Sequence, residues 1–327
     1  MYTTGTTEIA CFLTGAAATI VPMTQTARVR IGWRDLPEAV RSRVERIIGG
    51  GAVTSADSQP GGFSPGTADR VVTESGRRAF VKAVSPAVNE RSAELARQEM
   101  HITSGMPAAA PVPRLLGGFD DGDWVVLVLE DIDGAHPRSP WVRSEIDAAM
   151  TALAELAAAV TPSPVAGVPH AAENLADDFA GWDKIAAAPP ADLDPWLAGR
   201  LPELRAAAAR GLAACSTGET LTHCDVRADN LLIRADGRVF VVDWPWGCVG
   251  PGWLDRLLLG LDVLVKGGDP ERVFEGIDPG VVTDVIAAVD GMFEHIHRLP
   301  PPPGIPTVRA FQRTAADAIR PWLRGRL

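Results

Sequence analysis

Apolar and polar residues follow different patterns in the two parts of the chain, and these patterns predict different secondary structure. The second part contains apolar residues at helical spacing and Ala- and Leu-rich runs, separated by Pro- and Gly-rich breaks. We expect helices there at residues 145–160, 174–188, 195–215, 253–266, 281–297 and 307–323. In the first part we expect helices at 34–48 and 90–101 and strands at 67–75, 79–84 and 123–133. The pattern predicts a strand-rich part followed by a mainly helical part.

One hairpin interrupts the helical part. The runs NLLIR at 230–234 and RVFVVD at 238–243 are rich in β-forming residues and are joined by the turn sequence ADG. A hairpin folds the chain back on itself, so Asn230 and Asp243 are expected at neighbouring ends of paired strands. Asp225 lies five residues before Asn230, on the loop that leads into the first strand. We therefore expect three oxygen-bearing side chains to converge.

Phosphoryl transfer requires this kind of convergence. One carboxylate orients the attacking hydroxyl, and an Asn/Asp pair holds Mg²⁺. Taken singly, an Asp in a turn and an Asp at a strand end are ordinary loop residues, so the order and spacing of the three carry the argument.

The first part of the chain contains features suited to binding phosphate. The segment QPGGFSPG includes Gly61, Gly62, Ser64 and Gly66, whose backbone N–H groups can approach phosphate oxygens closely. Lys82 follows in an apolar strand. A Gly-rich turn or a strand lysine is weak evidence when taken alone. Their order along the chain, upstream of Asp225, strengthens the interpretation.

The set His223-x-Asp225-x4-Asn230, followed by Asp243 after a hairpin and preceded by Lys82, resembles the aminoglycoside phosphotransferase family. This family is the antibiotic-kinase and choline-kinase-like branch of the protein-kinase-like fold. The resemblance covers about residues 55–265. It departs from the family at Cys224, where Gly is common, and from protein kinases at Trp244, which follows the metal-binding Asp.

The resemblance implies an α+β, protein-kinase-like bilobal fold with a small β-rich N-lobe and a larger, mainly α-helical C-lobe. We expect a disordered extension at 1–24, the nucleotide-binding N-lobe at 25–132 and the C-lobe, with catalytic loop and acceptor site, at 133–327. The apolar run at 9–23 is too short and too polar-flanked for a membrane span or a signal peptide.

The resemblance also implies roles for individual residues. Asp225 is the catalytic carboxylate, and His223 is expected to pack within the catalytic loop. Asn230 and Asp243 hold Mg²⁺. Lys82 binds the phosphates of ATP, with GTP left open as the donor, and its partner on the following helix is Glu99, with Glu94 as second choice. Backbone groups of residues 129–132, including Glu130 and Ile132, face the adenine.

Composition narrows the class of protein and of partner. The chain has 327 residues, 46% of them hydrophobic, and a formal net charge of −10. That charge argues against nucleic-acid binding and is compatible with a cationic acceptor. The four cysteines show no paired motif, which indicates a reducing compartment, and we expect a cytoplasmic monomer or homodimer.

The sequence leaves the acceptor open between an aminoglycoside or other antibiotic, as in antibiotic resistance, and a metabolite such as a sugar, amino sugar or amino alcohol. Acids that could bind a cationic acceptor, or be ordinary solvated charges, are Asp177, Asp178, Asp183, Asp262 and Glu294. A non-catalytic nucleotide-binding regulator is the alternative class. The presence of Lys82, Asp225, Asn230 and Asp243 together argues against it.

Overall fold

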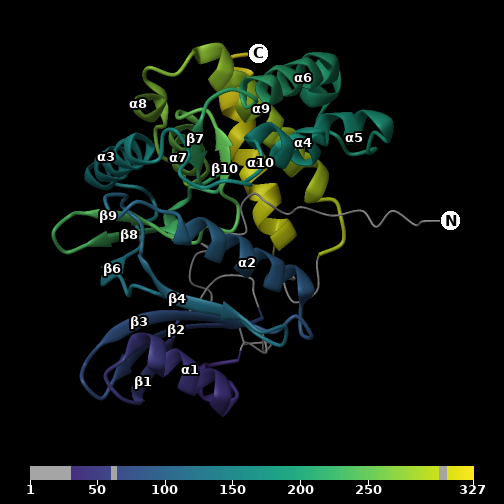
Figure 1. Ribbon diagram of the computed structural model, residues 1–327. Coiled ribbons are helices and arrows are strands. Elements are labelled where there is room, and N and C mark those ends of the chain that lie inside the picture. The colour runs from purple at the N-terminus through teal and green to yellow at the C-terminus, as the bar shows by residue number, and fades with distance from the viewer. Residues whose placement is uncertain (1–30, 60–64, 302–307) are drawn as a thin grey trace.

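The computed structural model describes residues 31–59, 65–301 and 308–327, which form two lobes (Figure 1). The expected extension at 1–24 lies outside these residues. The N-lobe contains a five-stranded antiparallel sheet in the order β1-β2-β3-β5-β4, flanked by two α-helices. Its elements are η1 (Trp33–Asp35), α1 (Glu38–Ile48), β1 (Val53–Ser58), β2 (Thr67–Thr73), β3 (Arg78–Val84), α2 (Glu90–Ser104), β4 (Leu115–Asp120) and β5 (Val125–Leu129).

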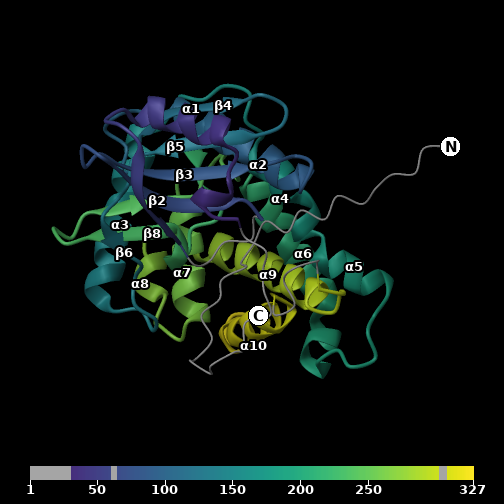
Figure 2. The same cartoon turned by 90° about the horizontal axis from the view of Figure 1, so that it is seen from below.

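Alternation along the central strands of the N-lobe gives the sheet two apolar faces. Val81 and Val126 pack with Val44 of α1 on one face. Leu127 and Leu129 pack with Ala93 of α2 on the other. Figures 1 and 2 show α1 and α2 on opposite sides of the sheet, with α2 between the sheet and the helical lobe. Because side chains alternate along a strand, Lys82, the residue after Val81, faces α2.

The C-lobe is mainly helical, with short strands around the predicted hairpin. Its helices are α3 (Arg143–Ala159), α4 (Ala171–Phe179), α5 (Gly181–Ala187), α6 (Pro195–Ala214), α7 (Leu254–Val265), α8 (Glu271–Phe274), α9 (Pro279–Ile296) and α10 (Val308–Arg324). Its other elements are β6 (Gly134–Ala135), β7 (Thr220–Thr222), η2 (Ala228–Asn230), β8 (Leu231–Arg234), β9 (Val239–Val241) and β10 (Cys248–Gly250). In the described chain, none of the helices is long and apolar enough to cross a membrane.

Helix α9 is the central element of the C-lobe and is buried between α5, α6 and α10 (Figure 2). Glycines allow the closest crossings. A Cβ added to Gly291 would lie 2.4 Å from Cδ1 of Trp182 on α5. The Trp182 indole donates a hydrogen bond of 2.7 Å to the carbonyl of Ala287, so this fully buried ring is fixed against α9.

Most of the predicted elements are present. The hairpin is β8–β9, with Leu231 paired to Val241, and the buried strand within 123–133 is β5. The predicted helix at 174–188 is wrong in one respect, because two helices separated at Ala180 occupy that region. The antiparallel pair β7–β10 was not predicted, since three-residue strands are too short to show a period.

Candidate active site

The catalytic loop, defined here as residues 223–230, runs from the end of β7 through η2 to β8 and is hydrogen-bonded to α7. The carboxylate of Asp255, near the start of α7, accepts hydrogen bonds from the backbone N–H of His223 at 2.8 Å and of Cys224 at 3.0 Å. Cys224 has φ 63°, in the left-handed region that favours glycine. These two bonds fix the loop directly before Asp225.

Within the loop, Asp225 and Asn230 lie side by side. The Asn230 amide donates to the backbone oxygen of Asp225 at 2.8 Å and to its Oδ2 at 3.2 Å. The Oδ1 of Asp225 is buried and accepts no hydrogen bond from the described residues. Burial raises the pKa of Asp225 to about 7, opposed by Arg227, whose Nη1 lies 3.6 Å from Oδ1. One carboxylate oxygen is therefore left for a ligand.

The contacts of His223 hold its ring in place within the catalytic loop. Its Nε2 donates to the carbonyl of Val242 at 2.9 Å, and its Nδ1 accepts from the backbone N–H of Asp225 at 3.2 Å. The ring meets the edge of Trp244 with centroids 4.7 Å apart. Burial lowers the pKa of His223 to about 4, so the ring is neutral near pH 7. These contacts support the predicted packing role.

Lys82 joins the two lobes. Its Nζ lies 2.7 and 2.8 Å from the carboxylate oxygens of Glu99 on α2, and 2.5 Å from Oδ1 of Asp243. Burial opposes the charge of Lys82, but the two carboxylates outweigh it and raise the pKa of the amine. Glu94, the second candidate, pairs instead with Arg91. The structure thus brings Lys82, Glu99 and Asp243 together.

Asn230 and Asp243 lie at the neighbouring ends of the β8–β9 hairpin. The backbone N–H of Val242 donates to the carbonyl of Asn230 at 2.9 Å, which holds the two ends of the hairpin together. Amide and carboxylate oxygens are the hard ligands that Mg²⁺ prefers, and Mg²⁺ often takes only one or two protein ligands beside substrate phosphates. The donor set fits Mg²⁺, and Asn230 and Asp243 would be its protein ligands. No cluster of three or more His, Cys, Asp or Glu suited to a metal exists in the described part of the chain.

On the nucleotide side, Gly61, Gly62 and Ser64 lie outside the described residues. Gly66 is described, and a Cβ there would lie 2.2 Å from the carbonyl oxygen of Ala83, so its lack of a side chain lets the chain enter β2 against β3. It therefore has a structural function at that position, beside the expected role in phosphate binding.

The linker between the lobes offers two unused backbone groups. The N–H of Glu130 donates to the carbonyl of Arg114, and the carbonyl of Ile132 accepts from Gly134. The carbonyl of Glu130 and the N–H of Ile132 make no hydrogen bond to a described residue. A backbone acceptor and a backbone donor are the kinds of group that bind the edge of a nucleobase.

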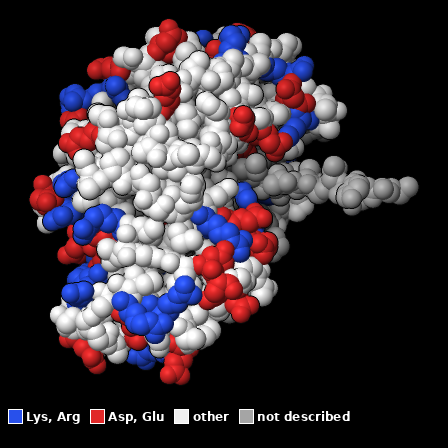
Figure 3. Space-filling model, in the orientation of Figure 1, with Lys and Arg blue, Asp and Glu red and all other residues white. Residues whose placement is uncertain are grey.

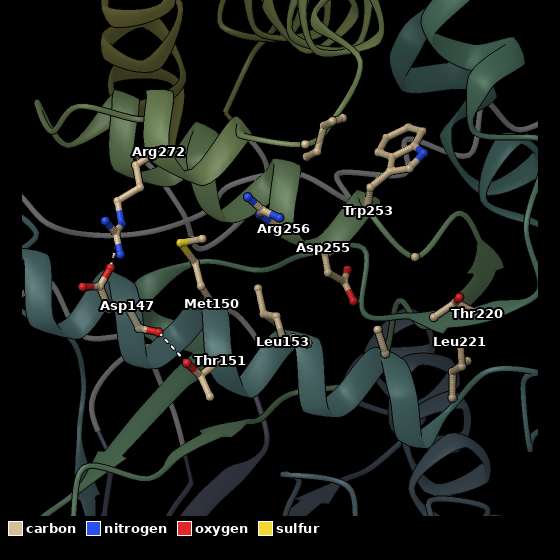
Figure 4. A pocket seen from close by; sticks show the side chains of 15 residues that line it. Asp147, Met150, Thr151, Leu153, Thr220, Leu221, Trp253, Asp255, Arg256 and Arg272 are labelled. Atoms are coloured by element: carbon tan, nitrogen blue, oxygen red, sulfur yellow. Dashed lines mark hydrogen bonds and ion pairs between the residues drawn. The ribbon is translucent and has the colours of Figure 1, made fainter.

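A cavity of about 580 Å³ lies behind the catalytic loop, between α3 and α7 (Figure 4). Met150 and Leu153 of α3 form an apolar wall, and Arg272 pairs with Asp147 at its edge. Asp255 lines the cavity and also holds the catalytic loop. The cavity does not include Lys82, Asp225, Asn230 or Asp243, so it is separate from the candidate active site.

The five acids considered for a cationic acceptor are in different environments. Asp177 pairs with Lys184, and Asp183 with Arg205, both near the surface. Glu294 is buried among arginines, and Asp262 and Asp178 are buried as well. The interpretation of all five as solvated charges is thus wrong for three of them. On the face drawn in Figure 3, charges of both signs are interspersed over the described residues.

Two of the cysteines form a disulfide that the sequence analysis did not predict. The structure joins Cys224 of the catalytic loop to Cys248 of β10 in a disulfide, while Cys215 is free and buried. The sequence showed no paired motif because the two cysteines are 24 positions apart and meet only through the pairing of β7 with β10.

Comparison with known proteins agrees with this geometry. No curated protein sequence matches significantly. The structure resembles aminoglycoside phosphotransferase from Alicyclobacillus acidocaldarius (TM-score 0.52, 16% identity, 89% of this chain and 95% of that chain covered). It also resembles choline kinase LicA from Streptococcus pneumoniae (TM-score 0.59, 15% identity, 87% and 98% covered).

A third similar structure is the GDP and kanamycin complex of APH(2″)-IIia (TM-score 0.58, 14% identity, 88% and 97% covered). At these identities the likeness shows the fold, which is that of the protein-kinase-like phosphotransferases. The family model of the phosphotransferase enzyme family (APH) matches residues 60–255, which include Lys82, the catalytic loop and Asp243. The chain therefore belongs to the phosphotransferase enzyme family and is a small-molecule kinase.

Proposed function

We propose that the protein transfers the γ-phosphoryl group of ATP to a hydroxyl of a small molecule, with Mg²⁺ bound at Asn230 and Asp243. The observation that carries this proposal is the meeting of Lys82 with Asp243, because it joins a phosphate-binding cation of the N-lobe to a metal-binding carboxylate of the C-lobe. Solved structures of the same fold include complexes with ADP, AMP-PNP or GDP, which support a nucleotide donor.

In this mechanism Asp225 positions the acceptor hydroxyl and receives its proton on the unbonded Oδ1. The acceptor oxygen bonds to the γ-phosphorus, the bond from that phosphorus to the bridging oxygen breaks, and ADP leaves. Lys82 binds the nucleotide phosphates and is held in place by Glu99. Bound Mg²⁺ supplies charge neutralisation along the phosphates. The free carbonyl of Glu130 and N–H of Ile132 receive the base.

The acceptor class is proposed as an antibiotic such as an aminoglycoside, with a metabolite alcohol as the second candidate. Similar structures contain hygromycin B, spectinomycin or kanamycin, and one is a choline kinase. Polycationic acceptors require free carboxylates, but two of the five acids considered are paired with basic side chains and the other three are buried. This favours including weakly charged alcohols in any screen. We propose a cytoplasmic location because the donor, ATP, is abundant there, although the Cys224–Cys248 disulfide is of a kind that is rare in that compartment.

The test is an ADP-release screen of the parent protein with Mg-ATP over aminoglycosides, other antibiotics, amino sugars and choline-like alcohols. Asp225→Ala should lower the rate with the accepted substrate by about 10²–10⁴-fold. Asp236→Ala, at the exposed hairpin turn, is the matched control and should act at the parent rate. A parent-like rate in Asp225→Ala would exclude this mechanism.

A further inference from the structure

Helix α7 presents a second carboxylate to the catalytic loop, two turns beyond Asp255. Asp262 lies seven residues after Asp255, and a spacing of seven returns to the same face of a helix. Both side chains are buried, with Asp262 only 3% exposed. Whereas Asp255 binds the first residues of the loop, Asp262 binds its second half.

The contacts of Asp262 are specific. Its Oδ2 accepts a hydrogen bond from the backbone N–H of Ala228 at 3.1 Å and from the indole Nε1 of Trp141 at 2.9 Å. The ammonium of Lys266, the residue that follows the last residue of α7, lies 3.1 Å from the same oxygen. Three donors from three segments thus fix one carboxylate oxygen, which leaves Asp262 unsuited to binding a cationic acceptor.

Ala228 begins η2, the turn from which Asn230 emerges. The N–H of Asn230 donates to the carbonyl of Arg227 at 3.0 Å, so the residue before Ala228 is part of the same turn. Arg227 also donates two hydrogen bonds to the carboxylate of Asp229 and lies beside Asp225. A fixed Ala228 N–H therefore fixes the side chains on both sides of the turn.

We propose that Asp262, held by Trp141 and Lys266, is a positioning residue that sets the place of Asn230 and thereby the Mg²⁺ requirement of the enzyme. The proposal rests on the proposed function, because it assigns Asn230 to the metal. Residues that orient metal ligands from outside their shell commonly change metal affinity or activity by about 10–100-fold when they are removed. Within the described chain, Asp255 binds only the backbone N–H groups of His223 and Cys224. Without Asp262, the backbone N–H of Ala228 would therefore have no partner on α7.

The test measures kcat, the KM for ATP and acceptor, and the Mg²⁺ concentration that gives half the maximal rate. Asp262→Ala should lower kcat by about 10–100-fold and raise the half-saturating Mg²⁺ concentration by a similar factor. The KM for the acceptor should stay within about twofold of the parent value, since Asp262 is buried and already bound by three donors of the protein. Asp262→Asn keeps an oxygen for the Ala228 N–H and should recover most of the Mg²⁺ affinity.

Asp290→Asn is the matched control, because Asp290 is a fully buried carboxyl on α9 away from the loop. It should leave the Mg²⁺ requirement at the parent value. The proposal is overturned if Asp262→Ala and Asp290→Asn show the same Mg²⁺ dependence, or if Asp262→Ala only lowers the fraction of folded protein.

A readout without turnover separates this proposal from the proposed function. The Mg²⁺ dependence of ATP binding can be measured by thermal shift in the parent and both variants. If the parent transfers phosphate to no acceptor, the proposed function fails, whereas a weakened Mg²⁺ dependence in Asp262→Ala still supports the positioning role. An unchanged dependence in a folded Asp262→Ala protein removes the positioning role even when the parent is active.

Discussion

At the scale of single residues, Asp178 on α4 is the clearest case of a carboxyl in an unfavourable place. It is 6% exposed, and its Oδ2 has no hydrogen-bond partner in the described chain. Burial raises its pKa to about 8, with a further rise from Asp177 and an opposing effect of Lys184. Ionisation of this group therefore works against the folded state.

We expect Asp178→Asn to change how stability depends on pH. A carboxyl with a raised folded pKa contributes stability below the unfolded value near 3.8, and that contribution is lost as pH rises through about 8. The free energy of unfolding of the variant should exceed that of the parent by a margin that grows from pH 4 to pH 9, reaching about 1–3 kcal/mol. Urea denaturation across this range measures it.

Asp236→Asn serves as the control for that series, since Asp236 is exposed at the β8–β9 turn and is not among the charges that act on Asp178. It should show no such pH trend. If the Asp178 and Asp236 variants shift in parallel, burial of Asp178 is not the cause.

Lys82 gives a second prediction at this scale. Lys82→Met should destabilise the protein by about 3 kcal/mol, because Glu99 then remains buried without its cation. The double variant with Glu99→Gln should regain most of the unfolding free energy but none of the activity. Denaturation together with the ADP-release assay separates the two effects. Equal stability of the single and double variants would contradict the pairing.

At the scale of elements, the crossing of α5 and α9 depends on the absence of a side chain. Gly291→Ala should cost about 1–3 kcal/mol, since the new Cβ would meet the fixed ring of Trp182. Gly199→Ala, on the exposed face of α6 with no atom within 4 Å of the added Cβ, should be neutral or stabilising. Thermal unfolding compares them, and a loss of the same size in both variants would exclude the crossing as its cause.

Sequence patterns predicted those elements whose stability is local. The hairpin turn ADG and the helical stripe at 34–48 each contain their own signal, and β8–β9 and α1 confirm them. The break at Ala180 was missed although Gly181 follows it, because a single Gly is tolerated within a helical pattern and α5 is set by packing on α9. The contacts of Asp262 with the loop were not predicted either, because its partners Trp141 and Ala228 are remote in sequence and only the fold brings them together.

The candidate site likewise contains some contacts that local spacing predicts and others that depend on how distant elements pack. Asp225, Asn230 and Asp243 lie on one short segment, so their spacing was enough to predict that Asn230 contacts Asp225 and that the two ends of the hairpin pair. Glu99 could be ranked above Glu94 only through the family resemblance, and the contact with Lys82 depends on how α2 rests on the sheet. Arg227, beside Asp225, was not singled out, although its position two residues later in the loop was a usable signal.

At the scale of the whole molecule, ligand binding should couple the two lobes. Mg-ATP at about 100 times its Kd should stabilise the parent by about 2.7 kcal/mol and raise its Tm, because it binds the folded protein and not the unfolded chain. Asp243→Ala should abolish metal-dependent turnover and the Mg²⁺-dependent part of the Tm rise. Thermal shift with and without Mg²⁺ measures this. A full Mg²⁺-dependent rise in the variant would exclude Asp243 as a metal ligand.

The linker between the lobes contains one further clue in its ion pairs. Asp131, whose side chain is 3% exposed, accepts hydrogen bonds from Arg70 of β2 and Arg78 of β3, and Arg70 also pairs with Asp133. The next residues, Gly134 and Ala135, pair with β8 of the C-lobe. Asp131 and Asp133 are thus held to the sheet of the N-lobe, and the next two residues to the C-lobe. We expect a change in the angle between the lobes to concentrate its backbone rotation between Asp133 and Gly134.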